Sequence, residues 1–445
     1  VYNMGSSVFS DCTNLTDVVL SEDLSWIQGS TFSNCTSLKS VKIPSNADTI
    51  YRSAFSGCTS LESITIPSAV SLIEQYAFYD CNSLKDIYYF GTETQWNKID
   101  IEENSAGDGN GALKNATIHY NKTIEPFTYN LNNDGKSVVI VKCDQTASEV
   151  TIPSKIDDLP VTVIDNGAFM SCSNLTNITV PESVEEIRYS AFANCENLES
   201  VTIPKSVKFI GADAFYKCEK LTTIDIDEDN ENYSFENGVL FDKDKTVLVK
   251  YPCAKVDTEY RIPNTVKEVR GGALRDVIHG FQKIYIPASV ESFPCFSDSH
   301  GTSNLSEIEV DGQNKNYKSQ DGVLYSKDMK QLLLYPFAKQ DVSYSVPEGV
   351  DYIKDIIDVQ HLKNIVLPKS LYRIYGYIQV ENVYIDQTYD WYQSQQNAYH
   401  WVLQRIIWNN TTIYVRDSQL RDYFMKENAE QLEKYHATIS EVYNW

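Results

Sequence analysis

The apolar residues of this chain recur in one fixed arrangement, seen in residues 61–81, LESITIPSAVSLIEQYAFYDC. Leu-x-x-Ile-x-Ile contains an alternating pair, Ile64 and Ile66, which predicts a short strand with these side chains inward. Pro67 ends the strand, because proline cannot donate to a central ladder. Val-x-x-Ile then marks the returning side of a coil. Ala77 and Phe78 predict a tight helical turn that brings Cys81 back into register.

This arrangement repeats every 23 residues, as the cysteines show most clearly. Cys12, Cys35, Cys58 and Cys81 are evenly spaced, and Cys172, Cys195 and Cys218 resume the same step. A period this short predicts stacked coils, with like residues about 4.8 Å apart in continuous buried columns. We therefore expect parallel strands starting near residues 16, 39, 62, 85, 176, 199 and 222.

The repeat closely resembles the BspA-like leucine-rich repeat. Its Phe-x-x-Cys element occurs in seven units, at residues 8–12, 31–35, 54–58, 77–81, 168–172, 191–195 and 214–218. The resemblance implies an α/β leucine-rich-repeat solenoid, wound as a right-handed superhelix with short parallel strands. It also implies surface-exposed or secreted proteins linked to adhesion, some of which bind extracellular matrix proteins. The family supplies no catalytic residues that could be transferred to this chain.

The period breaks between Cys81 and Cys172, which predicts two arrays, residues 1–120 and 121–445. We expect a terminal unit at 88–120 in which Trp96 covers the exposed edge of the core, although a ligand-binding Trp96 is the alternative. Residues 127–131 and 137–141 flank Asp134-Gly135 and predict a hairpin that starts the second array.

Later in the chain a longer unit occurs twice, 84 residues apart. Asn237-Gly238 and Asp321-Gly322 each precede an apolar run, which predicts a repeat enlarged by a β-hairpin. The helical spacing of apolar residues in 417–435, with Asp417 or Ser418 as N-cap, predicts a C-terminal helical cap.

The charge balance limits the class of partner. The chain has 38 Lys and Arg against 61 Asp and Glu, a formal net charge of −23, which argues against binding nucleic acid. No stretch approaches the roughly 20 apolar residues of a membrane-spanning helix. Val8–Cys12 already matches the inside of a repeat, so we expect a fragment of a longer precursor that carries the signal and anchor elsewhere.

Ten cysteines could suggest a disulfide framework, but seven occupy one equivalent site per turn among apolar residues. Equivalent side chains point the same way, which disfavours a bond between neighbours. We expect buried reduced thiols at Cys35, Cys58, Cys195 and Cys218. Cys143, Cys253 and Cys295 do not follow the period, so the repeat assigns them neither burial nor a bonding state.

Catalytic and metal-binding motifs are weak. Asp225, Asp227, Asp229 and Glu236 imitate a calcium loop, but Asn230 stands where such a loop has glycine, so a solvated acidic loop is the favoured interpretation. No histidine has metal-ligand spacing with another histidine or a cysteine. We expect no cofactor, no metal and no catalytic residue, with an unrecognised carbohydrate-active enzyme as a remote alternative.

The remaining candidates lie on outward strand positions and among the C-terminal aromatics. In the first array the outward positions are Lys42, Thr65 and Tyr88, and in the second they are Thr179, Thr202, Asp225, Tyr285 and Glu309. Seven aromatic residues, among them Tyr384 and Trp391, crowd residues 384–408, either as interface groups or as the core of a cap.

These observations predict a monomeric, non-enzymatic extracellular or cell-surface protein that binds a host or matrix protein or a glycan. The candidate binding surface consists of Tyr88, Asp225, Tyr285, Glu309, Tyr384 and Trp391. The alternative is a structural spacer or stalk with no specific ligand.

Overall fold

The structure is a computed structural model. It describes residues 4–441 except 104–108, 148–149, 276, 278–280, 295–303, 355–358, 360, 377, 390–404 and 407–409. The chain forms two compact units. Unit 1 comprises residues 1–175, 179–193 and 206–214, and unit 2 comprises residues 176–178, 194–205 and 215–445. The expected division into arrays at residue 120 concerns the repeats, not these units, and stays a prediction.

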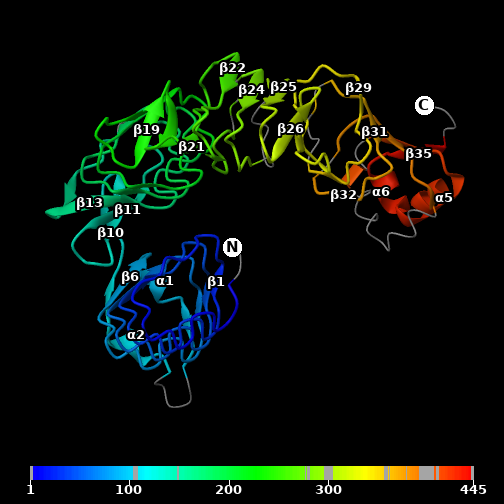
Figure 1. The fold of residues 1–445 in the computed structure, drawn as a ribbon. Coiled ribbons are helices and arrows are strands. Elements are labelled where there is room, and N and C mark those ends of the chain that lie inside the picture. Colours follow the sequence, from blue (N-terminus) through cyan, green and yellow to red (C-terminus); the bar gives the residue numbers. More distant parts are fainter. Residues whose placement is uncertain are drawn as a thin grey trace. The chain divides into compact units, whose positions relative to one another are not determined.

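The first array, in unit 1, is a stack of two-sided coils (Figure 1, blue to cyan). One side is the parallel sheet of β2 (Ser40–Lys42), β4 (Ser63–Pro67), β6 (Asp86–Phe90) and β8 (Thr117–His119). The returning side is a second parallel sheet of two-residue strands, β1 (Trp26–Ile27), β3 (Thr49–Ile50), β5 (Leu72–Ile73) and β7 (Asp100–Ile101). The sequence analysis placed the return of the coil here but did not predict these strands.

The predicted strands are parallel, and six of the seven start one residue later than expected. They are β2, β4 and β6 in the first array, and β14 (Asn177–Thr179), β16 (Ser200–Ile203) and β18 (Thr223–Ile226) in a separate sheet. The strand expected near residue 16 is absent from the described residues there. That segment belongs to the first coil of the stack, which has a neighbouring coil on one side only.

Each coil closes through a turn and not through the tight helical turn that the sequence predicted. Asp11, Asn34, Gly57 and Asp80, each directly before a repeat cysteine, have left-handed φ angles between 59° and 75°. Glycine, asparagine and aspartate adopt this conformation at the least steric cost. The turn backbone therefore favours these residue types before the first four repeat cysteines, whereas Ser171 and Lys217 adopt the same conformation before Cys172 and Cys218.

Columns of identical residues fill the core of the first array. Phe9, Phe32, Phe55 and Phe78 stack with ring centroids 5.3 to 5.4 Å apart. Trp96 ends α1 (Glu93–Trp96), is 8% exposed and meets Tyr89 edge to face, so it covers the core as predicted. The short helix α2 (Gly111–Asn115) adds Leu113 to the same core.

The hairpin predicted after residue 120 is present in unit 1, where β10 (Phe127–Leu131) and β11 (Val138–Cys143) pair antiparallel. β9 (Lys122–Ile124) adds to β10 on the other side. From β11 the sheet continues in parallel through β13 (Leu159–Ile164), β15 (Glu186–Ile187) and β17 (Phe209–Ile210), and β12 (Lys155–Ile156) pairs with β13.

Unit 2 contains both enlarged repeats. The first is β19 (Tyr233–Glu236), β20 (Val239–Asp242) and β21 (Val247–Lys250), and the second is β26 (Tyr317–Gln320), β27 (Val323–Ser326) and β28 (Gln331–Leu334). Short strands β23 (Glu268–Val269), β30 (Tyr352–Ile353) and β32 (Arg373–Ile374) continue these sheets in parallel. Both hairpins were predicted from their Asn-Gly and Asp-Gly turns.

The strands of the outward sheets of unit 2 have three or four residues and are longer than the two-residue strands β23, β30 and β32. One sheet is β22 (Glu259–Arg261), β24 (Lys283–Ile286) and β25 (Glu307–Val310). The other is β29 (Ser343–Ser345), β31 (Asn364–Leu367), β33 (Asn382–Ile385), β34 (Thr412–Val415) and β35 (Thr438–Glu441). The predicted C-terminal cap is α5 (Ser418–Glu427), with Asp417 as its N-cap, and α6 (Ala429–Lys434).

We predict that Phe78→Ala lowers the free energy of unfolding by roughly 3–5 kcal/mol, because it opens a cavity in a stacked column. Phe78 is fully buried, whereas the adjacent Tyr79 is 46% exposed. Tyr79→Ala is the matched control, and we expect it to cost less than about 1 kcal/mol. Denaturant melts measure both values, and equal losses would contradict the inward and outward assignment.

We also predict that all ten cysteines titrate as thiols after unfolding without reductant. None of the nine described cysteines forms a disulfide, and eight of them are buried, as expected for Cys35, Cys58, Cys195 and Cys218. Burial raises the pKa of the Cys58 thiol to about 12, which suppresses the reactive thiolate. In the native protein the exposed Cys12 should therefore react first. Fewer than ten thiols after unfolding would indicate a disulfide.

Candidate binding surface

The outward row of the first array is Lys42, Thr65, Tyr88 and His119, one residue from each of four paired strands. The Tyr88 ring stacks on the His119 ring at 4.8 Å, and His119 Nε2 lies 2.8 Å from Asp86 Oδ1. The alternation of the strands thus places these side chains on one face, as the sequence predicted.

That face is covered by the turn of the β10–β11 hairpin. Thr65 Oγ1 donates to Asn133 Oδ1, and a Cβ built on Gly135 would lie 3.2 Å from Tyr88 Oη. Thr65 is 2% exposed and Tyr88 4% exposed. The prediction that Tyr88 belongs to an accessible binding surface is wrong here, because a segment distant in sequence packs on this face. Tyr88 therefore offers no contact area to a partner in this structure.

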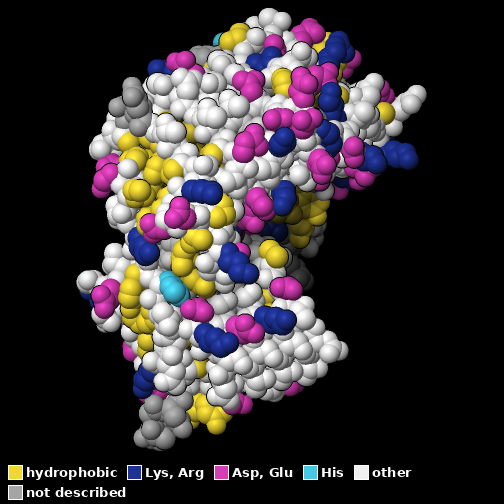
Figure 2. Space-filling view, turned by 90° about the vertical axis from the view of Figure 1, so that its left-hand side faces the viewer, with side chains coloured by type: hydrophobic (Ala, Val, Ile, Leu, Met, Phe, Trp, Pro, Cys, Tyr) yellow, Lys and Arg dark blue, Asp and Glu magenta, His cyan; other side chains and the backbone are white. Residues whose placement is uncertain are grey.

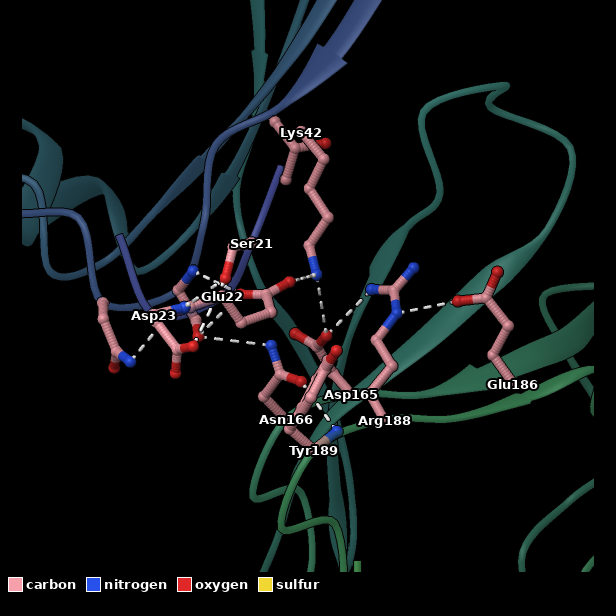
Figure 3. A network of polar contacts seen from close by, with 12 residues as sticks. Ser21, Glu22, Asp23, Lys42, Asp165, Asn166, Glu186, Arg188 and Tyr189 are labelled. Atoms are coloured by element: carbon pink, nitrogen blue, oxygen red, sulfur yellow. Dashed lines mark hydrogen bonds and ion pairs between the residues drawn. The ribbon is translucent and has the colours of Figure 1, made fainter. Parts of the chain in front are cut away.

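An ion network continues the same contact (Figure 3). Lys42 Nζ lies 2.8 Å from Glu22 Oε1 and 3.7 Å from Asp165 Oδ1. Arg188 binds Asp165 Oδ1 through Nη1 and Glu186 Oε2 through Nε, both at 2.8 Å. Residues of the first coils are thus linked with β15 and with the residue that follows β13.

The electrostatics of this network favour charged Asp165. Burial of its side chain opposes ionisation, but Lys42 and Arg188 outweigh burial, so the pKa of Asp165 lies below its ordinary value. The pKa of Glu22 is lowered in the same way by Lys42 and by hydrogen bonds from Ser45. The network is a structural contact within unit 1, and no sequence signal linked its members.

In unit 2 the structure brings Tyr285 and Glu309 together on the sheet β22–β24–β25. Their row also contains Arg261, whose guanidinium carbon lies 3.4 Å from the Tyr285 ring centroid. Lys283 Nζ lies 2.7 Å from Glu307 and 2.8 Å from Glu309. On this surface, basic and acidic side chains therefore form pairs around the Tyr285 ring.

Tyr384 lies on the sheet β29–β31–β33–β34–β35, in register with Tyr414. The two rings stack at 4.7 Å with planes 12° apart. Beside them Asn382 Nδ2 donates to Asn364 Oδ1 and Asn364 Nδ2 donates to Ser343 Oγ, both at 2.8 Å. Sequence reasoning missed Tyr414, although Thr-Ile-Tyr-Val (412–415) has the same pattern as Asn-Val-Tyr-Ile (382–385). Trp391 lies outside the described residues.

Asp225 lies apart from these residues, exposed on β18 and in register with Thr202, and it accepts a 3.0 Å hydrogen bond from Thr223 Oγ1. In the acidic loop that follows, Asn230 is fully buried and its amide bonds the Pro204 carbonyl and the Asn232 and Tyr233 amides. Within the described ranges, no group of three His, Cys, Asp or Glu side chains could hold a metal ion.

Charge is distributed and not segregated on the face that Figure 2 draws. Acidic and basic side chains are interspersed there, so neither sign forms a continuous field on that face. Among the described residues, the helices are too short or too polar to cross a membrane.

The fold defines a leucine-rich-repeat solenoid made of stacked coils. The model of the BspA type leucine rich repeat region matches residues 2–129 and 142–243 in six copies, more than half of the chain. The chain belongs to this family. No curated protein matches.

Among solved structures, a leucine rich cell surface protein of Faecalibacterium prausnitzii is 22% identical, with 88% of this chain and 84% of that one covered and a TM-score of 0.38. The pneumococcal vaccine antigen PcpA is 19% identical over 91% of this chain and 85% of its own, with a TM-score of 0.40. A leucine-rich repeat protein of Bacteroides ovatus is 18% identical, with 93% and 86% covered and a TM-score of 0.29.

We predict that Asp165→Asn lowers the free energy of unfolding at pH 7 by roughly 2–3 kcal/mol, because Lys42 and Arg188 lose a buried carboxylate. A lowered pKa contributes stability above the unfolded value of about 3.9, and this contribution disappears as pH falls through the folded pKa. The difference between wild type and variant should therefore shrink as the pH falls below about 4 and through the folded pKa of Asp165.

Glu185→Gln is the control, since Glu185 forms an exposed pair with Lys208 at 2.8 Å. It should cost less than about 1 kcal/mol. Urea melts across this pH range measure all three proteins, and a difference that does not depend on pH would contradict the assignment of a charged Asp165.

Proposed function

We propose that this chain is a non-enzymatic binding protein of the cell surface or extracellular space. It attaches to a host or matrix protein or to a glycan through the outward face of the sheet β29–β31–β33–β34–β35. The observation that carries the proposal is the stacked Tyr384–Tyr414 pair beside a ladder of amide and hydroxyl groups. Tyrosines provide rigid contact area with a polar tip and lose little entropy on binding.

The contrast between the two outward sheets supports this choice. The row around Tyr88 is covered by a hairpin of the same chain, whereas Tyr384 and Tyr414 are only partly buried. The strongly acidic net charge of −23 favours basic or neutral partners over acidic ones. Membership of a family of surface repeats is consistent with a location outside the cell.

The test measures binding of the purified chain to immobilised host matrix proteins and to a glycan array. We predict that Tyr384→Ala and Tyr414→Ala each weaken binding roughly tenfold, as truncation of a central interface tyrosine does. Tyr372→Ala is the control, because Tyr372 is 38% exposed but precedes β32 in a different sheet.

Unchanged binding in both variants would exclude this face. Absence of binding to every target would favour the spacer alternative. Hydrolysis of any target by the purified chain, lost when a carboxylate is replaced, would overturn the non-enzymatic proposal.

A further inference from the structure

A cavity of about 550 Å³ lies where the first enlarged repeat meets β22. The residues around it include Val239 and Phe241 of β20, both 1% exposed, and the partly buried Tyr260 of β22. Its polar lining includes Glu236 at the end of β19 and Asp257 before β22. The volume falls in the range of small-molecule sites, which combine apolar walls with a few polar groups.

Every carboxylate that lines the cavity already has a basic partner. The pairs are Glu236 with Lys245 at 2.6 Å, Asp257 with Lys255 at 2.6 Å, and Glu259 with Arg261 at 3.9 Å. A ligand ammonium group would have to displace a Lys or Arg from its carboxylate, and a ligand carboxylate would have to displace an Asp or Glu from its basic partner. A neutral ligand with several hydroxyl groups can instead donate to the carboxylates and accept from the basic groups, in charge-assisted hydrogen bonds.

Tyr260, one of the residues around the cavity, carries a buried polar group. Its hydroxyl oxygen is closed to solvent and has no hydrogen-bond partner among the described residues. A buried hydroxyl without a partner destabilises a fold by about 1–3 kcal/mol, so such groups call for an explanation. Burial, with Glu236 and Asp257 nearby, raises the pKa of Tyr260, so the hydroxyl keeps its proton as a donor.

In the second enlarged repeat, 84 residues on, the tyrosine hydroxyl at the equivalent position has a hydrogen-bond partner. Tyr344 stands at the position of Tyr260, and its hydroxyl is hydrogen-bonded to the hydroxyl of Tyr325. The position of Tyr325 is Phe241 in the first repeat, which has no hydroxyl to offer. The missing bond of Tyr260 therefore follows from one residue that differs between two copies of one unit.

The charged lining differs between the two copies as well. Glu236, Glu259 and Arg261 correspond to Gln320, Ser343 and Ser345. One tyrosine–aspartate hydrogen bond is present in both copies. Tyr251 Oη donates to Asp257 at 2.6 Å in the first copy, and Tyr335 Oη donates to Asp341 at 3.1 Å in the second. Five of the ten residues that line the cavity of the first copy, Asn237 and Phe241 among them, differ in the second copy.

We propose that this cavity binds a neutral saccharide. The paired charges hold its hydroxyl groups, the partly exposed Tyr260 ring contacts its C–H face, and one sugar oxygen accepts from the Tyr260 hydroxyl after the side chains that cover this hydroxyl shift. The site is separate from the Tyr384–Tyr414 face and does not rest on the function proposed for that face.

The test titrates the full chain with glucose, galactose, N-acetylglucosamine and lactose by calorimetry and saturation-transfer NMR. Glucuronate and lysine methyl ester are the charged probes. Phe241→Tyr installs the residue of the second repeat and should weaken saccharide binding at least roughly tenfold, because the new hydroxyl takes the Tyr260 bond and part of the cavity. Tyr260→Phe, which keeps the ring, should weaken binding several-fold.

Tyr325→Phe is the matched control, since it makes the reciprocal change in the second repeat and should leave saccharide binding unchanged. Loss of binding in both variants of the first repeat, with the control intact, supports the proposal. It is overturned if no neutral sugar binds, if only a charged probe binds, or if Phe241→Tyr and Tyr260→Phe both bind like wild type. A crystal soaked with the sugar that shows only ordered water at Tyr260 also overturns it.

Discussion

Backbone hydrogen bonds between successive coils hold the repeats at a constant spacing, and most of the structure depends on them. In the turns, Phe32 N donates to Ala54 O and Phe55 N donates to Ala77 O, both at 2.8 Å. The coil spacing is therefore that of paired strands, about 4.8 Å. Each side chain then meets the same position of the next coil, so a residue type that packs well against itself recurs along the chain. The stacked phenylalanine column is the direct result.

The same constraint explains the cysteines more fully than apolar packing does. Cys58 Sγ donates to Phe32 O and Cys81 Sγ to Phe55 O, both at 3.1 Å, so each thiol satisfies a carbonyl of the preceding coil. A methyl group of similar size would leave that bond unmade. A small apolar residue that is also a weak donor suits a site facing a backbone carbonyl. The recurrence of cysteine thus reflects hydrogen bonding as well as size.

Interruptions of the repeat decide which surfaces a partner can reach. The β10–β11 hairpin covers the outward row of the first array, while the hairpin of the first enlarged repeat borders a cavity with β22. Outward direction could be predicted for Tyr88 and Tyr285, because it follows from the alternation of each strand. Exposure could not, because it depends on segments far away in the sequence. The pairing of Tyr384 with Tyr414 likewise required the register between two strands that are distant in the chain.

The sequence by itself determined the coil, its period, the stacked core, both hairpin repeats and the helical cap, because these features are local or are copied from one coil to the next. Tertiary structure alone decided the burial of Thr65 and Tyr88, the ion network around Asp165 and the missing partner of Tyr260. Each of these arises where non-equivalent segments meet. There a side chain finds a different neighbour from the one that the repeat would supply, and no periodic pattern encodes that neighbour.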